Sequence, residues 1–318
     1  MVTTGASLRL AFFGTPEFAV PSLRAAAGSR HELVAVVSQP DRPKGRGHRL
    51  QPTATKQAAL DAGVAVLQPP RIKDEDFLAT FRDLRIDLGI VAAYGKILPD
   101  ALLAIPPMGM INVHASLLPA YRGAAPVHRA VIDGRAETGV TIMRVVRELD
   151  AGPMLAKAVR PIGEDETSVD VEKGLAEIGA QLLMDVVEQL AAGLAREEPQ
   201  DDGLATYAAK IVREEGMVPW TLAAATIHNR VRGLQPWPLV SVRLEGQRYL
   251  LHRTKVVAGE AATAAPGTIV EAAGERLVVA TGEGMLQILQ LQPEGRRVLN
   301  SREVLAGYRI RPGMQFQP

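Results

Sequence analysis

An amide, an imidazole and a carboxylate occur within one stretch of the chain, Ile111 to Asp150. They belong to Asn112, His114 and Asp150. Residues two apart in a β-strand point to the same face, so Asn112 and His114 project together if a strand continues to His114. Asp150 follows His114 by 36 residues and cannot be placed by spacing alone. We therefore expect a polar cluster that Asp150 joins if the chain folds back.

These three side chains suit acyl transfer to an amine. A neutral amine is already a nucleophile, so the protein need only stabilise the tetrahedral oxyanion and move protons. An amide and an imidazole can donate to that oxyanion, and a neighbouring carboxylate favours the charged imidazole and fixes its ring. The same residue types also occur as ordinary capping or core polar groups. From the residues alone, both interpretations stay open.

Other kinds of catalysis fit the sequence less well. The chain has no cysteine, which excludes thiolate nucleophiles, disulfides and cysteine-ligated zinc. Ser116 lies two residues from His114, but it lacks the flanking glycines of a nucleophile elbow. Only His128 is a further histidine nearby, with no recognised ligand spacing, so we expect no metal.

Alternating apolar runs and helical patterns indicate the fold that positions this cluster. Leu8 to Phe13 is a buried run that feeds a helix through Gly14-Thr15-Pro16, and further strands are expected at 33–38, 64–67, 88–92 and 109–114. We predict an α/β fold with a doubly wound, mostly parallel Rossmann-like sheet. Open sheets of this kind bind ligands at the carboxyl ends of their strands, where Tyr94 to Pro99 and the cluster itself lie.

The remainder of the chain predicts a second, smaller domain. A long amphipathic helix over 168–192 closes the first domain, and an acidic, polar stretch over 193–206 is the expected linker. Short strands with glycine turns follow, which fits a small β-barrel of the oligonucleotide-binding (OB-like) type. The predicted organisation is a catalytic domain over 1–192, a linker over 193–206 and an OB-like domain over 207–318.

Charge is unevenly distributed along the chain. The net charge is +1, but residues 211–318 hold 13 basic and 9 acidic side chains, which suggests a polyanion-facing module. On this count alone, ordinary solvated surface charge is the favoured explanation. The loop from Gln39 to Arg49 has four Lys or Arg against one Asp and nothing apolar to bury. We expect this loop to be exposed and mobile and to contact a phosphate backbone.

The composition also bears on the compartment. A hydrophobic content of 47% with 22% charged residues is typical of a globular protein. No apolar run reaches the roughly 18 residues of a membrane span. Met1 to Gly5 has no basic region of a signal peptide. We expect a cytoplasmic protein.

Four ordered motifs resemble the signature of the folate-dependent formyltransferases. They are Asn112-Val-His114, Ser116-Leu-Leu-Pro119, Tyr121-Arg-Gly123 with Pro126, and Gly139-Val-Thr followed by Leu149-Asp-Ala-Gly152. The resemblance implies formyl transfer from 10-formyltetrahydrofolate, with Asn112, His114 and Asp150 as the catalytic set. It also implies that folate lies against the side chains of Ser116, Leu117, Leu118 and Pro119, and against Ile97 and Leu98.

Three further features resemble the branch of that family that acts on initiator methionyl-tRNA in translation initiation. They are Phe12-Phe-Gly-Thr-Pro-Glu-Phe18, the basic insertion after Gln39, and a C-terminal part with Pro236-Trp237-Pro238 and Pro266-Gly267-Thr268. The resemblance implies that the basic loop and the C-terminal barrel contact the tRNA. The expected tRNA-binding side chains are Arg42, Lys44, Arg46 and Arg49. We expect a monomer.

Two rival functions remain at this point. A formyltetrahydrofolate hydrolase or a small-amine formyltransferase of the same fold would keep the catalytic set, but it does not account for the basic insertion. A non-catalytic RNA-binding protein would account for the loop and the barrel, but not for the Asn, His and Asp together.

Overall fold

The computed structural model describes residues 6–44, 49–258 and 264–318, and its chain divides into two compact units. The first unit holds Met1–Gly123, Thr138–Arg160 and Glu172–Tyr207. The second holds Ala124–Glu137, Pro161–Val171 and Ala208–Pro318. The units are therefore discontinuous in sequence, and residues 193–206, the expected linker, lie within the first unit. The domain boundaries expected from the sequence stay a prediction.

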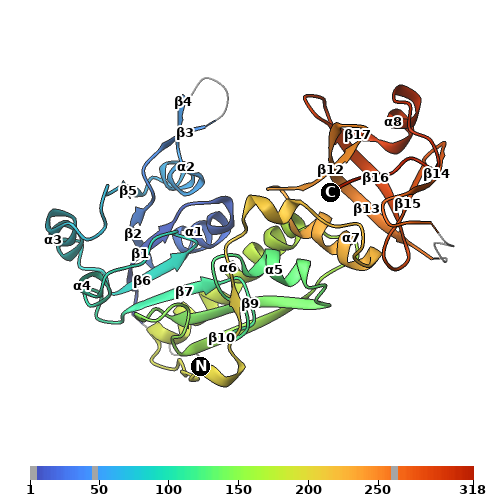
Figure 1. The fold of residues 1–318 in the computed structure, drawn as a ribbon. Coiled ribbons are helices and arrows are strands. Elements are labelled where there is room, and N and C mark those ends of the chain that lie inside the picture. Colours follow the sequence, from blue (N-terminus) through green and yellow to red (C-terminus); the bar gives the residue numbers. More distant parts are fainter. Residues whose placement is uncertain (1–5, 45–48, 259–263) are drawn as a thin grey trace. The chain divides into compact units, whose positions relative to one another are not determined.

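A seven-stranded sheet forms the centre of the first unit (Figure 1). Its strands in spatial order are β10 (Met154–Pro161), β9 (Glu137–Arg144), β7 (Met110–His114), β6 (Leu88–Ala92), β1 (Arg9–Gly14), β2 (Glu32–Val37) and β5 (Ala65–Leu67). The five strands from β7 to β5 pair in parallel, whereas β9 runs antiparallel to β7. This is the expected mixed α/β, Rossmann-like arrangement, and it puts the carboxyl ends of β1, β6 and β7 at one edge.

Helices connect these strands. Their bounds are η1 (Glu17–Ala19), α1 (Val20–Ala27), α2 (Ala54–Asp61), α3 (Glu75–Asp83), α4 (Asp100–Leu103) and α6 (Ser168–Ala191). The helix expected directly after Pro16 begins as a 3-10 turn and becomes α-helical only at Val20. On one side of the sheet, Phe13 packs edge-on against Phe81 of α3 and against Tyr94, with ring centroids 5.5 and 5.7 Å apart. This core supports the loop after β6.

The second unit is built on an antiparallel sheet in the order β12 (Val240–Leu244), β13 (Gln247–Val257), β16 (Met285–Pro293), β15 (Arg276–Ala280) and β14 (Ile269–Ala273). β17 (Leu299–Asn300) pairs with β16. Among the strands that the structure describes, no pairing of β12 with β14 closes this sheet. The antiparallel sheet is as expected, and a barrel of the oligonucleotide-binding type stays a prediction.

Helices of the second unit pack on one hydrophobic core with this sheet. They are α5 (Pro126–Ile132), α7 (Ala224–Gly233) and α8 (Ser301–Gly307), and the unit also contains η3 (Arg213–Gly216). α7 begins four residues after Trp220, which is itself buried in the core and stacks on Phe316. Ala125 and Ile132 at the ends of α5 join this core, which explains why α5 groups with the second unit. No described helix is long and apolar enough to span a membrane.

Candidate active site

β7 lies between β6 and β9 and carries Asn112 and His114 at its carboxyl end. Asn112 pairs in register with Met143, and His114 pairs with Thr141. The strand does continue to His114, so the two side chains share one face of the sheet. Asn112 is partly exposed and His114 is buried, with 5% of its surface accessible.

The His114 ring is held between a carbonyl and a carboxylate. Its Nε2 lies 3.0 Å from the backbone oxygen of Tyr121. A carbonyl oxygen can only accept, so this nitrogen carries a hydrogen and donates it. Nδ1 lies 3.7 Å from Oδ2 of Asp150, and both side chains are largely shielded from solvent. The ring therefore presents Nδ1 as the nitrogen that is available for proton movement.

Asp150 reaches this place through an unusual backbone conformation. Its φ is +49°, in the left-handed region that costs about 1–2 kcal/mol for most residues and is tolerated best by Asn and Asp. Oδ2 of Asp150 accepts a hydrogen bond of 2.8 Å from the N–H of Gly123. Two residues on, a Cβ at Gly152 would lie 1.9 Å from the Arg144 oxygen, so only glycine allows this return of the chain. The hairpin between β9 and β10 thus brings Asp150 back to β7.

The Ser116 to Pro119 turn is tied down by its own polar groups. The Ser116 hydroxyl donates to the Ala120 oxygen over 2.6 Å. Thr141 Oγ1 donates to the Ser116 oxygen over 2.7 Å and accepts from the Leu118 N–H over 3.1 Å. Ser116 is thus engaged in shaping the turn. Leu118 is buried with Met143 and Met154, whereas Leu117 and Pro119 are only partly buried.

The loop after β6 contributes two residues of opposite exposure. Ile97 is 85% exposed, although it is a large apolar side chain. Leu98 is buried in the core beneath the sheet. Because β6 is the parallel neighbour of β7, this loop and the catalytic candidates leave the same edge of the sheet.

Gln200 and Arg122 support this site, although neither had a role assigned from the sequence. Gln200 Nε2 donates to the backbone oxygens of Asp150 and Gly152, over 2.8 Å each. Arg122 Nε donates to Gln200 Oε1 over 3.0 Å. Gln200 falls in the expected linker, and its partners lie 50 and 48 residues earlier, so no local pattern could have found it.

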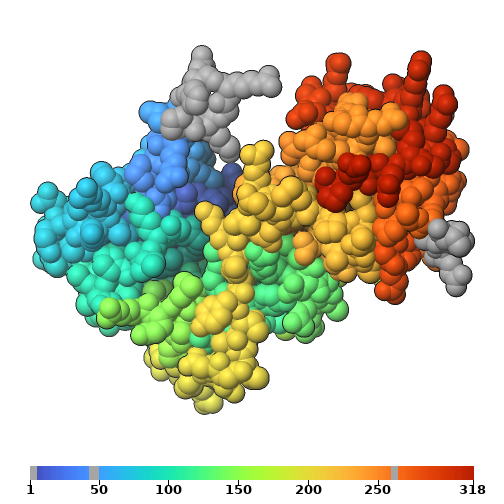
Figure 2. Space-filling view, viewed as in Figure 1, coloured from blue at the N-terminus to red at the C-terminus, as the bar shows by residue number. Residues whose placement is uncertain are grey.

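The segment around Gln200 is attached to the site at both ends. Glu198 exchanges two backbone hydrogen bonds of 2.8 Å with Met154. β11 (Tyr207–Ala208) pairs with β8 (Arg122–Gly123). Figure 2 shows residues in the yellow of positions near 200 on the surface of the molecule. This stretch is thus part of the scaffold of the candidate site.

The basic segment after Gln39 has more order than a bare loop. β3 (Arg42–Lys44) and β4 (Arg49–Gln51) pair antiparallel, with Lys44 opposite Arg49. Arg42 is exposed, and Arg46 lies outside the described residues. The one acid of the segment, Asp41, is held as a carboxylate, because hydrogen bonds from Gln68 and then from Lys56 lower the pKa of its carboxyl. Its charge is offset by the ion pair with Lys56.

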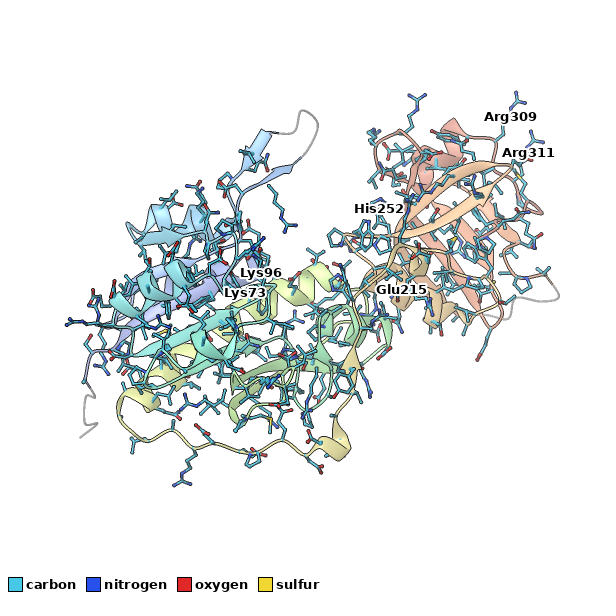
Figure 3. The ribbon with its side chains drawn as sticks, turned by 60° about the vertical axis from the view of Figure 1, so that its left-hand side comes forward. Lys73, Lys96, Glu215, His252, Arg309 and Arg311 are labelled. Carbon is cyan, nitrogen blue, oxygen red and sulfur yellow. The ribbon has the colours of Figure 1, made fainter. Side chains whose placement is uncertain are left out.

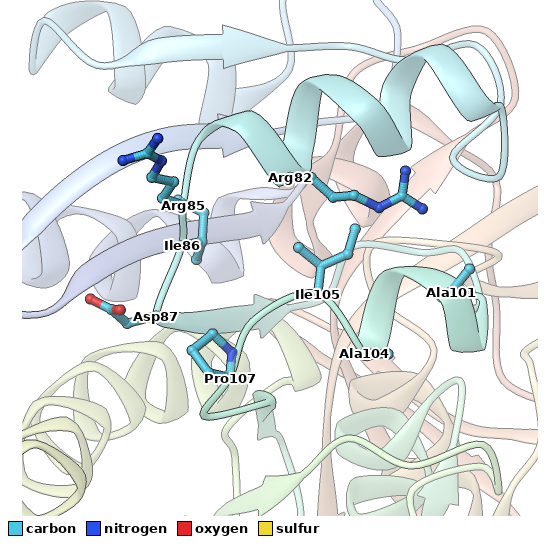
Figure 4. Close-up of a pocket in the computed structure, with 8 residues that line it drawn as sticks. All are labelled: Arg82, Arg85, Ile86, Asp87, Ala101, Ala104, Ile105 and Pro107. Atoms are coloured by element: carbon cyan, nitrogen blue, oxygen red, sulfur yellow. The ribbon is translucent and has the colours of Figure 1, made fainter.

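A separate hollow lies before the amino ends of β6 and β7 (Figure 4). Arg82, Arg85, Ile86 and Asp87 line one side, and the other is lined by Ala101, Ala104, Ile105 and Pro107. It is therefore at the opposite edge of the sheet from His114. Across residues 6–44, 49–258 and 264–318, no group of three or more His, Asp or Glu side chains is arranged to hold a metal ion.

Comparison with known proteins identifies the family. The model of the formyl transferase family matches residues 8–187, and that of the formyl transferase C-terminal domain matches residues 210–309. The methionyl-tRNA formyltransferase of Pelobacter propionicus is 46% identical over 307 residues, which cover 96% of this chain and 95% of the relative. The chain belongs to the methionyl-tRNA formyltransferase family.

Other similarities agree with this membership. The methionyl-tRNA formyltransferase of Moorella thermoacetica is 44% identical over 306 residues, or 96% of this chain and 98% of the relative. Among solved structures, an N-formyltransferase from Helicobacter canadensis superposes with a TM-score of 0.68 at 16% identity, covering 90% of this chain and 99% of that one. At that identity the likeness shows the shared formyltransferase fold, and the family assignment comes from the sequence relatives.

Proposed function

We propose that this protein transfers the formyl group of 10-formyltetrahydrofolate to the α-amine of methionine on initiator methionyl-tRNA. The observation that carries the proposal is the pairing of His114 with Asp150 on the strand that holds Asn112, in a member of the methionyl-tRNA formyltransferase family. The folate co-substrate is supported by the structural neighbour from Helicobacter canadensis, which was solved in complex with folinic acid.

The reaction assigns a role to each catalytic residue. The neutral amine attacks the formyl carbon, and Asn112 and His114 donate to the oxyanion that develops. Nε2 of His114 is already engaged by the Tyr121 oxygen, so the donor is Nδ1 in the charged ring. Asp150 lies 3.7 Å from that nitrogen and receives the proton that the attacking amine loses. The carbon–nitrogen bond to the folate then breaks, and the folate nitrogen is protonated.

Folate is expected beside the two loops that leave the carboxyl ends of β6 and β7. Ile97, Leu117 and Pro119 offer accessible apolar surface for its ring system. Leu98 and Leu118 are buried beneath this surface and support it from below. The Ser116 hydroxyl holds the turn in shape.

The tRNA is expected to contact both units. In the first, the hairpin of β3 and β4 carries Arg42, Lys44 and Arg49, and Arg46 belongs to the same basic segment. In the second, which we propose to be an OB-like barrel, exposed cations such as Arg309 and Arg311 project outward (Figure 3). A chain that acts on initiator tRNA would work in the cytoplasm, and we propose that it does so as a monomer.

A single assay tests this function. The protein is incubated with 10-formyltetrahydrofolate and one of three acceptors: charged initiator tRNA, free glycinamide ribonucleotide or water alone. Formyl-methionyl-tRNA is the expected product. Formylation of glycinamide ribonucleotide, or release of formate without an acceptor, at a comparable rate would overturn the choice of acceptor.

The tRNA contact is tested separately at Arg42, because its side chain is exposed and its position is described. Arg42→Ala should weaken tRNA binding and lower the slope of log K against log salt by roughly one unit if one phosphate contact is lost. Arg82→Ala is the matched control, since Arg82 is exposed at the opposite edge of the sheet. Equal effects of the two substitutions would contradict a specific role of Arg42.

A further inference from the structure

We propose that Gln200, held by Arg122, is a positioning residue that sets the place of Asp150 beside His114. The inference rests on the proposed formyl transfer, and it assigns a task to residues 193–206, which the sequence suggested to be a linker. Gln200 touches neither His114 nor the atoms that react, so its effect would pass through Asp150.

The first reason is the backbone of Asp150. Its left-handed conformation is one that the chain leaves readily unless neighbouring groups hold it. Gln200 Nε2 donates one hydrogen to the Asp150 oxygen and the other to the Gly152 oxygen, both over 2.8 Å. Both donor hydrogens of the Gln200 amide are thus bonded to the carbonyls on either side of Ala151.

The second reason is the orientation of the Gln200 amide. Its Oε1 accepts from Arg122 Nε over 3.0 Å, which directs the NH2 group toward the two carbonyls. Arg122 is itself buried, and its other end donates to Asp202 over 2.8 Å. The amide therefore has one favourable orientation, because the reversed one would set an N–H against the guanidinium and an oxygen against two carbonyls.

The third reason is that these bonds form a closed ring. Gly123 follows Arg122 in the chain, and its N–H donates to the Asp150 carboxylate over 2.8 Å. The ring runs from Arg122 to Gln200, from Gln200 to the Asp150 backbone, from the Asp150 side chain to Gly123, and back to Arg122. Gln200 thus holds the backbone of Asp150, and Gly123 holds its carboxylate. Together these bonds fix the 3.7 Å separation between the carboxylate and Nδ1 of His114.

Two substitutions separate the parts of this ring. Gln200→Leu is similar in size and removes every hydrogen bond of the amide. Gln200→Glu keeps an acceptor for Arg122 but removes both donors to the carbonyls. It therefore tests only the clamp, by which we mean the two hydrogen bonds from Gln200 Nε2 to the Asp150 and Gly152 oxygens. It also replaces the leucine variant if that variant does not fold. Gln235→Leu is the matched control, because Gln235 Nε2 also donates to two carbonyls, those of Val231 and His252, within the second unit.

Steady-state kinetics on methionyl-tRNA measure the effect. Both Gln200 variants should lower kcat about 10- to 100-fold, with KM for folate and tRNA within about twofold, because a small displacement of a catalytic group costs that much in rate. In an Asp150→Asn background, Gln200→Leu should add less than about threefold, since its effect passes through that carboxylate. The same factor in both backgrounds, or kcat of both variants within threefold of wild type, would overturn the inference.

A second readout requires no substrate and keeps the inference separate from the proposed function. Hydrogen exchange of the Gly123 amide, followed by NMR, reports whether the Asp150 carboxylate stays in place. Exchange should quicken in both Gln200 variants and stay unchanged in Gln235→Leu. Unaltered protection of Gly123 would refute the clamp, whereas a wild-type protein that formylates no methionyl-tRNA would refute only the function.

Discussion

His114 and His228 are both buried beside a backbone oxygen and a carboxylate, but they differ in how many of their ring nitrogens are hydrogen-bonded. Nε2 of His114 lies 3.0 Å from a backbone oxygen, that of Tyr121, and Nε2 of His228 lies 2.9 Å from that of Glu164. Each has a carboxylate just beyond hydrogen-bond distance, but at different ring nitrogens: Asp150 lies 3.7 Å from Nδ1 of His114, and Asp165 lies 3.8 Å from Nε2 of His228. A histidine held by a carbonyl and approached by a carboxylate is therefore not sufficient to mark an active site.

The other ring nitrogen distinguishes them. Nδ1 of His228 is hydrogen-bonded to Thr254 Oγ1 at 3.0 Å, so both nitrogens of this ring have protein partners. Nδ1 of His114 has no hydrogen bond within the described part of the chain, and it faces Asp150. The carboxylates differ as well, because the Asp165 side chain is 67% exposed and that of Asp150 is 15% exposed. Of these two residues, only His114 therefore has a ring nitrogen, Nδ1, that is available to a substrate.

The largest expected effect comes from removing Nδ1 of His114, and removal of Nδ1 of His228 is the comparison. His114→Gln keeps an amide donor where Nε2 was and should lower kcat about 10²- to 10³-fold, the usual cost of one oxyanion donor. His228→Gln should leave kcat within threefold and lower the free energy of unfolding by about 1–2 kcal/mol, because Thr254 loses its partner. Single-turnover kinetics and urea denaturation measure the two quantities, and an equal kinetic loss would erase the distinction.

The two carboxylates should differ in the same direction by a smaller factor. Asp150→Asn keeps an oxygen for the Gly123 N–H but removes the charge beside His114, and kcat should fall about 10²-fold, as for loss of a proton-transfer group. Asp165→Asn should be silent, since an exposed charge at that distance contributes about 0–1 kcal/mol. A loss below threefold for Asp150→Asn would remove Asp150 from the catalytic set.

Much of the scaffold around His114 was predictable from the sequence. Apolar runs predicted β1, β6 and β7 within about one residue, because buried parallel strands are continuous in hydrophobicity. The period of two in a strand was enough to put Asn112 and His114 on one face. The antiparallel strands of the second unit followed from short apolar alternation between glycines in the same way.

The parts that could not be predicted depend on contacts between distant segments. Asp150 meets His114 only because of a left-handed residue and a hairpin return, and neither has a local sequence signal. Gln200 binds carbonyls about fifty residues away, so it was assigned to a linker. The short helix α5 was missed as a member of the second core, since Ile132 packs there through contacts with α7 that are remote in sequence.

A third histidine, His128, is expected to affect only the pH dependence of stability, which is the smallest of these effects. Burial lowers the pKa of His128, a backbone hydrogen bond involving Gln235 opposes that shift, and the charge of Arg129 adds to it. The unfolded chain therefore takes up a proton first, near the ordinary value of about 6.5, and stability falls as pH decreases from there toward the lower folded pKa. His128→Gln should flatten this slope between about pH 7 and 5.5, above the range in which paired carboxylates such as Glu215 titrate. Urea denaturation across that interval measures the slope. An unchanged slope in the variant would mean that burial of His128 is not what couples its protonation to folding.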